Sequence, residues 1–248
     1  MKKIVLTVTG FLAALLPLIA QNTTPALPTS ITFEHKVMQL SNDEDGKATT
    51  TFWFTTDGNY ALAKHKDPDG DESTVLYTKD GQMCMIDEDA KTITVMNIPK
   101  AAGDISKAIS KDTKNLEKDK EPDLVVKSTG KTKTICGFTA YEYVGKNEGG
   151  SVSWWYAKVD FDPVLVYTMG AGKLGDMSAI KNKSSLNGNP FAIVVQNKNY
   201  LMAEVESGGK KGLETTGISK TTYSFSTAGY TVKKMGGLKQ ALLNKVHH

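Results

Sequence analysis

Residues 130–144, GKTKTICGFTAYEYV, carry the pattern that decides the fold. Two runs of β-forming residues flank a Cys-Gly pair, and the glycine supplies the backbone freedom that a tight reversal needs. On the second run Thr139, Tyr141 and Tyr143 share one face, because side chains alternate along a strand. A nucleotide-binding P-loop would need glycine at the position of Val125 and a helix after it. We therefore predict a β-hairpin and not a phosphate-binding loop.

The same alternation continues on both sides of this hairpin. About six strands are predicted between residues 30 and 98, where Val, Thr, Phe, Trp and Tyr recur at every second position. Asp-Gly pairs mark the reversals. Further strands are predicted over 123–130, 151–159 and 220–227, with a hairpin over 191–207 that turns around 197–199. The fold class is mainly β (α+β): a single highly curved antiparallel sheet or half-barrel with one or two covering helices.

Helical periodicity is confined to two segments. A polar helix is predicted from Gly103 to Leu116, where Ile105 and Ile109 lie one turn apart, and a short helix is predicted over 238–246. For residues 160–190 we predict no definite element.

The N-terminus has the order of a secretory signal peptide. Lys2 and Lys3 precede an apolar run over 4–18, and the small residue Ala20 precedes Gln21. No later apolar run is long enough to span a membrane as a helix. We expect an exported protein, periplasmic or secreted and not membrane-spanning. Its expected organisation is a signal peptide over 1–20, an extended leader over 21–29 and a single β-rich half-barrel domain over 30–248.

Charge argues against a nucleic-acid partner. Without residues 1–20 the chain has 28 basic and 27 acidic residues, so long-range attraction of a polyanion is weak. All the basic residues are lysines, and the arginine fork that usually reads bases and phosphates is missing from the sequence.

Two cysteines, Cys84 and Cys136, lie in a chain that is expected to reach an oxidising compartment. A disulfide between them is possible. The alternative is two unpaired cysteines buried on strands, and spacing alone does not decide between the two.

The hairpin stretch also resembles a known family. GKTKTICGFTAYEY, preceded by DLVVKSTG and followed by SWWYAK, is similar to the signature of an exported Gram-negative envelope family of unknown function. That signature has the form GK-x3-I-x-G-[FY]-x4-Y, and weaker similarity extends over most of residues 30–237. The family is similar in fold to the LolA and LolB lipoprotein carriers, in which a half-open barrel wraps an apolar cavity under helices. The resemblance implies this fold and an apolar ligand, and it implies no catalytic residue.

A binding role would need aromatic and methionine side chains, because flexible thioethers accept acyl chains of varied shape. The same side chains also serve as ordinary core filler. Trp154 and Trp155 are adjacent on a strand, so one of them faces away from any cavity unless both faces are covered. The candidate ligand-binding residues are Trp53, Tyr60, Met83, Met85, Met96, Tyr141, Tyr143 and Trp154.

Neither a metal site nor a catalytic site is predicted. Asp67, Asp69 and Asp71 alternate as in a calcium loop, but the glycine precedes the third acid and Thr78 stands where a glutamate is required. His35 and His65 lie on predicted strands outside any hydrolase or metalloprotease motif. We expect no cofactor, no metal and no enzymatic activity.

Three hypotheses follow for function. The first is a non-enzymatic periplasmic carrier for a lipid or a lipoprotein acyl chain. The second is a structural or protein-interaction module of the envelope, with a filled core and a protein partner. The third is a hydrolase with an unrecognised site, for which His35 and His65 are the available side chains.

Overall fold

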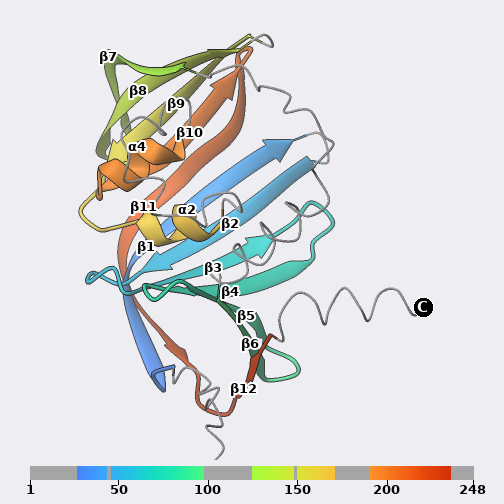
Figure 1. Ribbon diagram of the computed structural model, residues 1–248. Helices are drawn as coiled ribbons and strands as arrows, with labels where there is room; N and C mark the ends of the chain where they lie inside the picture. Colours follow the sequence, from blue (N-terminus) through green and yellow to red (C-terminus); the bar gives the residue numbers. More distant parts are fainter. Residues whose placement is uncertain (1–26, 44–45, 98–124, 148–149, 171–189, 236–248) are drawn as a thin grey trace, which may run out of the picture.

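The chain forms one open, strongly curled sheet of twelve strands, which a computed structural model describes for residues 27–43, 46–97, 125–147, 150–170 and 190–235 (Figure 1). The strand order is β12-β6-β5-β4-β3-β2-β1-β11-β10-β9-β8-β7. The pairs are antiparallel, except that β12 lies parallel to β6. The predicted mainly β class is confirmed.

The described elements follow the chain from a long first strand to a short last one. The strands are β1 Ser30–Asp43, β2 Gly46–Phe54, β3 Tyr60–Lys66, β4 Glu72–Thr78, β5 Gln82–Asp87, β6 Thr92–Asn97, β7 Val125–Ile135, β8 Phe138–Asn147, β9 Gly150–Lys158, β10 Tyr200–Ser207, β11 Lys210–Ser226 and β12 Thr231–Lys234. Two helices are described, α2 Val164–Gly170 and α4 Phe191–Gln196.

The predicted hairpin is confirmed as β7 and β8. Ile135 pairs with Phe138, so the loop holds only Cys136 and Gly137. Both loop residues have positive φ, 49° and 85°, which is the backbone of the tight turn that follows the twist of the strands. Glycine adopts this backbone freely, whereas a cysteine there is uncommon. The six strands predicted before residue 98 are confirmed as well.

The prediction of a hairpin over 191–207 was wrong in its first half. FAIVVQ forms α4, and only the second half is a strand, β10. A short continuous apolar run does not distinguish a buried strand from a buried helix, and here Pro190, with φ −62°, leads into a helix. The strand predicted over 220–227 is the end of β11. The helices predicted over Gly103 to Leu116 and over 238–246 lie outside the described residues, as does the signal peptide.

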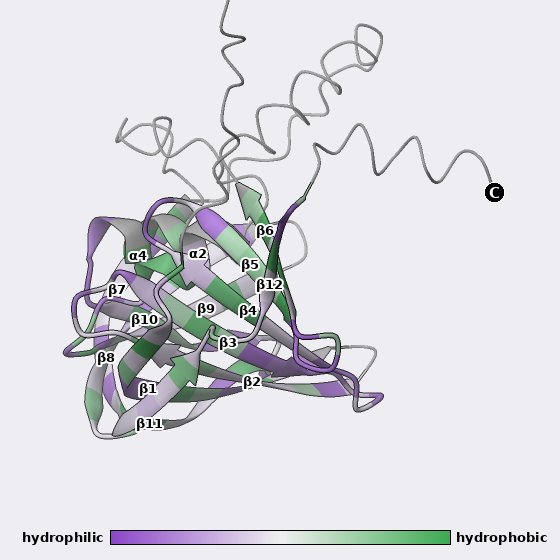
Figure 2. Ribbon diagram, turned by 90° about the horizontal axis from the view of Figure 1, so that it is seen from below, coloured by the Kyte–Doolittle hydropathy of each residue, from purple (hydrophilic) through white to green (hydrophobic). Residues whose placement is uncertain are grey.

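Buried side chains gather in two cores. The first core lies among β7 to β11, the middle of β1 and β2, and the helices; its largest fully buried members include Tyr156, Phe54 and Phe161. The second core lies between β3 to β6 and the ends of β1 and β11, where Phe33, Leu62 and Leu76 are fully buried. The end of β11 leads through β12 to β6, so the sheet curls around this second core (Figure 2). The helices α2 and α4 lie side by side on one face of the sheet (Figure 1).

Candidate functional site

Strands β2 to β6 have one face that is closed. Register aligns one residue from each strand into a row, and every member of the row packs in or against the second core: Trp53, Leu62, Leu76, Cys84 and Val95. Leu62, Leu76 and Cys84 have no exposed surface. We call this side of β2 to β6 the closed face.

The other side of the same strands carries α2, and its side chains become more exposed from β2 and β3 towards β5. One row consists of Phe54, Ala61, Tyr77, Met83 and Met96, and the neighbouring row of Phe52, Ala63, Val75, Met85 and Thr94. Phe54 and Ala61 are fully buried, whereas Tyr77, Met83 and Met96 are half-buried and Met85 is 38% exposed. We call this side the helix-bearing face, and its five apolar residues on β4 to β6 (Val75, Tyr77, Met83, Met85 and Met96) the methionine face.

Among the described elements, helix α2 is the cover of this side over β3 and β4. It contacts β3 and β4, and Tyr77 packs against the first core, so that burial raises the pKa of the Tyr77 phenol. The start of the helix is fixed by Asp162, whose Oδ1 accepts the Val164 amide at 3.0 Å. Just before it, Phe161 stacks between Phe54 and His35, with ring centroids 4.9 and 4.8 Å apart. The cover over β3 and β4 is therefore anchored, and the methionines of β5 and β6 lie beyond it.

The predicted ligand-binding residues are divided among three places. Met83, Met85 and Met96 lie together on the methionine face. Tyr141, Tyr143 and Trp154 lie on the side of β8 and β9 that faces α4, where Tyr143 meets Tyr156 edge-on and the Tyr156 hydroxyl donates to the Pro190 carbonyl at 2.8 Å. Trp53 and Tyr60 pack against the second core, on the closed side. The eight residues do not line one cavity.

Val75 and Tyr77 belong to the methionine face but were missing from the predicted set. Alternation along STVLYT places them on one side of their strand, but it does not say that this side adjoins Met83 and Met85. Pairing register supplies that information, and register follows from tertiary structure.

Both faces of β9 are covered, so neither of its two adjacent tryptophans is exposed to solvent. Trp154 and Trp155 are 7% and 9% exposed, although they point to opposite sides of the strand. On the side of Trp155 the Lys133 ammonium lies 4.1 Å from the ring centroid. The aromatic residues of β9 are therefore packed in the core.

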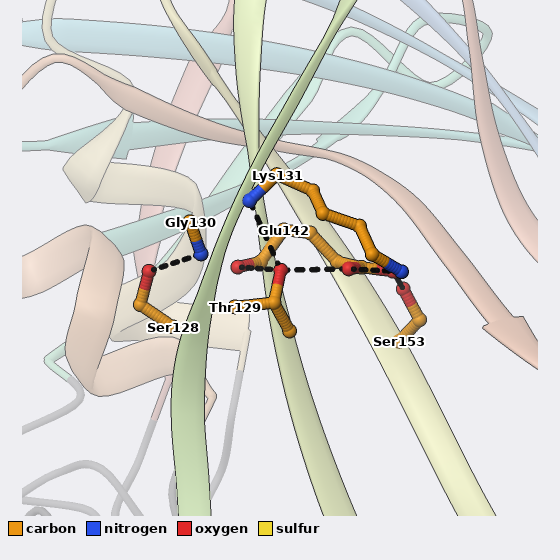
Figure 3. Close-up of polar contacts among 6 residues, drawn as sticks. All are labelled: Ser128, Thr129, Gly130, Lys131, Glu142 and Ser153. Carbon is orange, nitrogen blue, oxygen red and sulfur yellow. Dashed lines mark hydrogen bonds and ion pairs between the residues drawn. The ribbon is translucent and has the colours of Figure 1, made fainter.

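The side of β8 to β11 away from α4 is held by charge. Glu142, on the row of Trp155 and Glu204, accepts hydrogen bonds from Thr129 Oγ1 at 2.7 Å and Ser153 Oγ at 3.1 Å, and Lys131 Nζ lies 3.4 Å away (Figure 3). Burial alone would raise the pKa of Glu142, but these hydrogen bonds and the Lys131 charge outweigh it, and the pKa is lowered. Glu204 is paired with Lys133 and, at 3.0 Å, with Lys211.

The Gly-Lys-Thr run of the opening stretch lies inside this network. It forms a bulge in the edge strand β7, where pairing with β8 shifts between Ser128 and Thr132 and Gly130 has φ 76°. The Gly130 and Lys131 amides donate to the hydroxyls of Ser128 and Thr129 (Figure 3). A bulge with lysines protects an edge strand from pairing with another chain.

The possible disulfide is not formed. Cys84 is buried in the closed face, and Cys136 lies in the β7–β8 turn, where its thiol donates to the Thr215 carbonyl at 3.5 Å. Both are free cysteines. Burial raises the pKa of Cys84 to about 12 and also raises that of Cys136.

A cavity of about 550 Å³ lies where β1 begins and β2 ends. Its lining includes Glu34, Thr55, Thr56, Asp57 and, of the predicted residues, Tyr60. The Glu34 carboxylate accepts the Thr56 amide at 2.9 Å, and Asp57 accepts the Thr55 hydroxyl. The lining carboxylates already have protein partners, and Pro28 and Ile31 also line this cavity, so its lining mixes polar and apolar groups.

The acidic residues considered for metal binding and the histidines considered for catalysis contact other groups of the protein. Asp67 and Asp71 lie in a turn in which the Asp67 carboxylate accepts the Asp71 amide, and no cluster of metal ligands occurs among the described residues. His35 is buried; its Nδ1 lies 3.7 Å from Asp160, and its Nε2 lies 3.4 Å from the Thr56 hydroxyl. His65 Nδ1 lies 2.9 Å from the Thr50 hydroxyl on the helix-bearing face.

Comparisons with known proteins give structural similarity alone. No family model matches the chain, and no curated protein does. Similar solved structures include an uncharacterized conserved protein from Thermus thermophilus, with 7% identity, a TM-score of 0.40, and coverage of 82% of this chain and 90% of that one. PNGF-II has 10% identity and a TM-score of 0.40 over 85% of this chain and 32% of its own. MucB, crystallised with MucA(peri), has 9% identity and a TM-score of 0.34 over 76% of this chain and 50% of its own. Within the described part of the chain no helix is both long and apolar enough to cross a bilayer.

Proposed function

We propose that this chain is a non-enzymatic binding protein that holds an apolar ligand on its methionine face. One observation carries the proposal: Met83, Met85 and Met96 remain half-buried or exposed on β5 and β6, whose other side is buried in the second core through Cys84, Ile86, Ile93 and Val95. Of the five residues of the methionine face, Met85 is exposed and the other four are half-buried, so part of this apolar surface is left for a ligand to cover. A contiguous apolar surface of this kind indicates something that covers it.

The chemistry of the face suits a ligand of variable shape. Methionine side chains are flexible and polarisable, and Tyr77 adds a flat ring beside Met83. Each methylene that the ligand buries would contribute about 0.8 kcal/mol, without directional contacts. We therefore propose a lipid or a lipoprotein acyl chain as the ligand, and the periplasm as its place of action because of the expected signal peptide.

A protein-interaction module is the second candidate, and one observation favours it. Trp154 and Tyr156, which would line a deep cavity, are packed solid against the β8 tyrosines and the start of α4. In that case the methionine face would dock on an envelope protein. A carrier and a module differ in what co-purifies.

The first experiment is native mass spectrometry of residues 21–248, purified from the periplasm without detergent. A carrier gives a reproducible excess mass that extracts as lipid or acyl chain. The same protein is then titrated with N-phenylnaphthylamine, an uncharged apolar dye that fluoresces when it leaves water. A bare mass together with no dye binding would contradict the carrier and favour the module.

Two methionines make a matched control. Met85 and Met38 are 38% and 40% exposed, but Met38 pairs with Thr51 and so lies on the other side of the sheet from the methionine face. We expect Met85→Gln to weaken dye binding severalfold and Met38→Gln to leave it unchanged. Equal effects of the two substitutions would place the dye elsewhere.

A further inference from the structure

A polar row borders the apolar rows on the helix-bearing face. Register aligns Thr215, Gln39, Thr50, His65 and Ser73 across β11, β1, β2, β3 and β4. The next row on the same side is apolar: Ile218, Val37, Phe52, Ala63, Val75 and Met85. The two rows are about 7 Å apart on β1 to β4, where two residues separate them along each strand; on β11 a bulge makes the separation three residues.

The two halves of the polar row have different environments. Gln39 is buried, and its amide donates to the Met202 carbonyl at 2.8 Å and to Thr215 at 3.1 Å. Thr50 and His65 are half-buried and Ser73 is exposed. The accessible half of the polar row therefore lies beside Val75 and Met85; Met85 is the exposed member of the apolar row, whereas Ile218, Phe52 and Val75 are half-buried.

We propose that the ligand of the methionine face is a single-chain amphiphile whose headgroup binds at Thr50, His65 and Ser73. This inference rests on the proposed function and adds the headgroup to it. Its chain lies along the methionine face, and its oxygen atoms meet the Ser73 hydroxyl and the His65 ring. Thr50 holds Nδ1 of that ring at 2.9 Å, so Nε2 is the ring atom that the headgroup meets.

Charge selects the class of headgroup. Asp87 lies two residues after Met85 on the same side of β5 and is exposed, with its Oδ1 accepting the Ala90 amide at 2.7 Å. The two lysines that flank His65 point to the closed side, where Lys64 pairs with Glu88 and Lys66 with Glu72. Among the described residues of this face no lysine balances Asp87 against a carboxylate or phosphate, so an uncharged, hydroxyl-bearing headgroup fits better than an anionic one.

Displacement of N-phenylnaphthylamine by two short amphiphiles tests this. We expect decanoylglycerol to displace the dye at a concentration about tenfold lower than decanoate. His65→Ala should weaken decanoylglycerol about three- to tenfold, the range of one or two lost hydrogen bonds, and leave the affinity for the dye unchanged. Lys66→Ala, one residue along and on the closed side, is the matched control and should change neither.

The outcomes separate the headgroup site from the apolar face. Dye binding with equal displacement by both amphiphiles, or with no effect of His65→Ala, would overturn the headgroup site and leave the proposed function standing. If the unaltered protein does not bind the dye, the methionine face is not an apolar binding site and the proposed function is contradicted. A preference for decanoate would contradict the role assigned to Asp87.

Discussion

The two faces of β2 to β6 come from the same residues taken alternately, yet they differ in what covers them. On the closed face Leu76 and Cys84 pack against Phe33 and Phe225, which the ends of β1 and β11 bring round. On the helix-bearing face lie Tyr77 and Met85, which follow Leu76 and Cys84 in the chain. Among the described elements, α2 contacts β4, the strand of Tyr77, and Tyr77 packs against the first core. Apolar alternation therefore occurs both on a packed core face and on the proposed binding face, and the covering elements distinguish the two.

The largest expected effect tests whether the closed face is closed, through the reactivity of its thiol, Cys84. Native protein should react with a maleimide at Cys136 alone, because Cys84 is fully buried and burial raises its pKa to about 12. Unfolded protein should react at both. Mass spectrometry of the labelled chain counts the sites, and two fast sites in the native state would mean that the closed face is open.

Truncating a buried side chain of the closed face should lower the free energy of unfolding far more than truncating Met85 on the methionine face. Leu76→Ala removes a fully buried side chain and should lower the free energy of unfolding by about 2–5 kcal/mol, as leucine-to-alanine changes in cores do. Urea denaturation measures the loss. A loss below about 1 kcal/mol would show that the second core is loosely packed.

On the charged side of β8 to β11, ion pairs of Glu204 with Lys133 and Lys211 stabilise the sheet. Glu204→Gln should cost about 1–2 kcal/mol at pH 7, because it removes the partner of Lys133 and Lys211, both of which are partly exposed. Burial alone would raise the pKa of Glu204, but hydrogen bonds from the two lysines outweigh it and the pKa is lowered.

The sign of the pH dependence follows from that lowered pKa. The stabilising contribution of Glu204 is fully present above the unfolded-state pKa, near 4.5, and is lost as the pH falls through the lower folded-state pKa. The difference in free energy of unfolding between the unaltered protein and Glu204→Gln should therefore shrink below about pH 4.5. Urea denaturation at pH 7 and at pH 3 measures it, and an undiminished difference at pH 3 would contradict a charge-based role.

The smallest expected effect on stability is on the methionine face. Met85→Ala should change the free energy of unfolding by less than about 0.5 kcal/mol, because Met85 is 38% exposed. It should nevertheless weaken dye binding, as Met85→Gln should. A loss comparable to that of Leu76→Ala would make Met85 a core residue and remove the basis for a binding face.

Much of the fold could be predicted because its signals are local. Alternation and Asp-Gly turns placed β1 to β6, and the Cys-Gly pair placed the turn between β7 and β8. The run FAIVVQ could not be assigned correctly, since six apolar residues fit a buried strand as well as a buried helix. The division of the candidate residues among three places was equally hidden, because alternation shows which residues share a side of a strand but not what lies opposite that side.

The alternating strands, their turns and the neighbours that share a side could all be predicted from local sequence, because they depend on backbone geometry within a few residues. Tertiary contacts were needed to show that Trp53 and Tyr60 face the second core while Met83 and Met85 face away from it, and that Thr50, His65 and Ser73 form one row. Register between strands and the bend of β1 and β11 around the second core decide these, and both arise from contacts between residues that are distant in the chain.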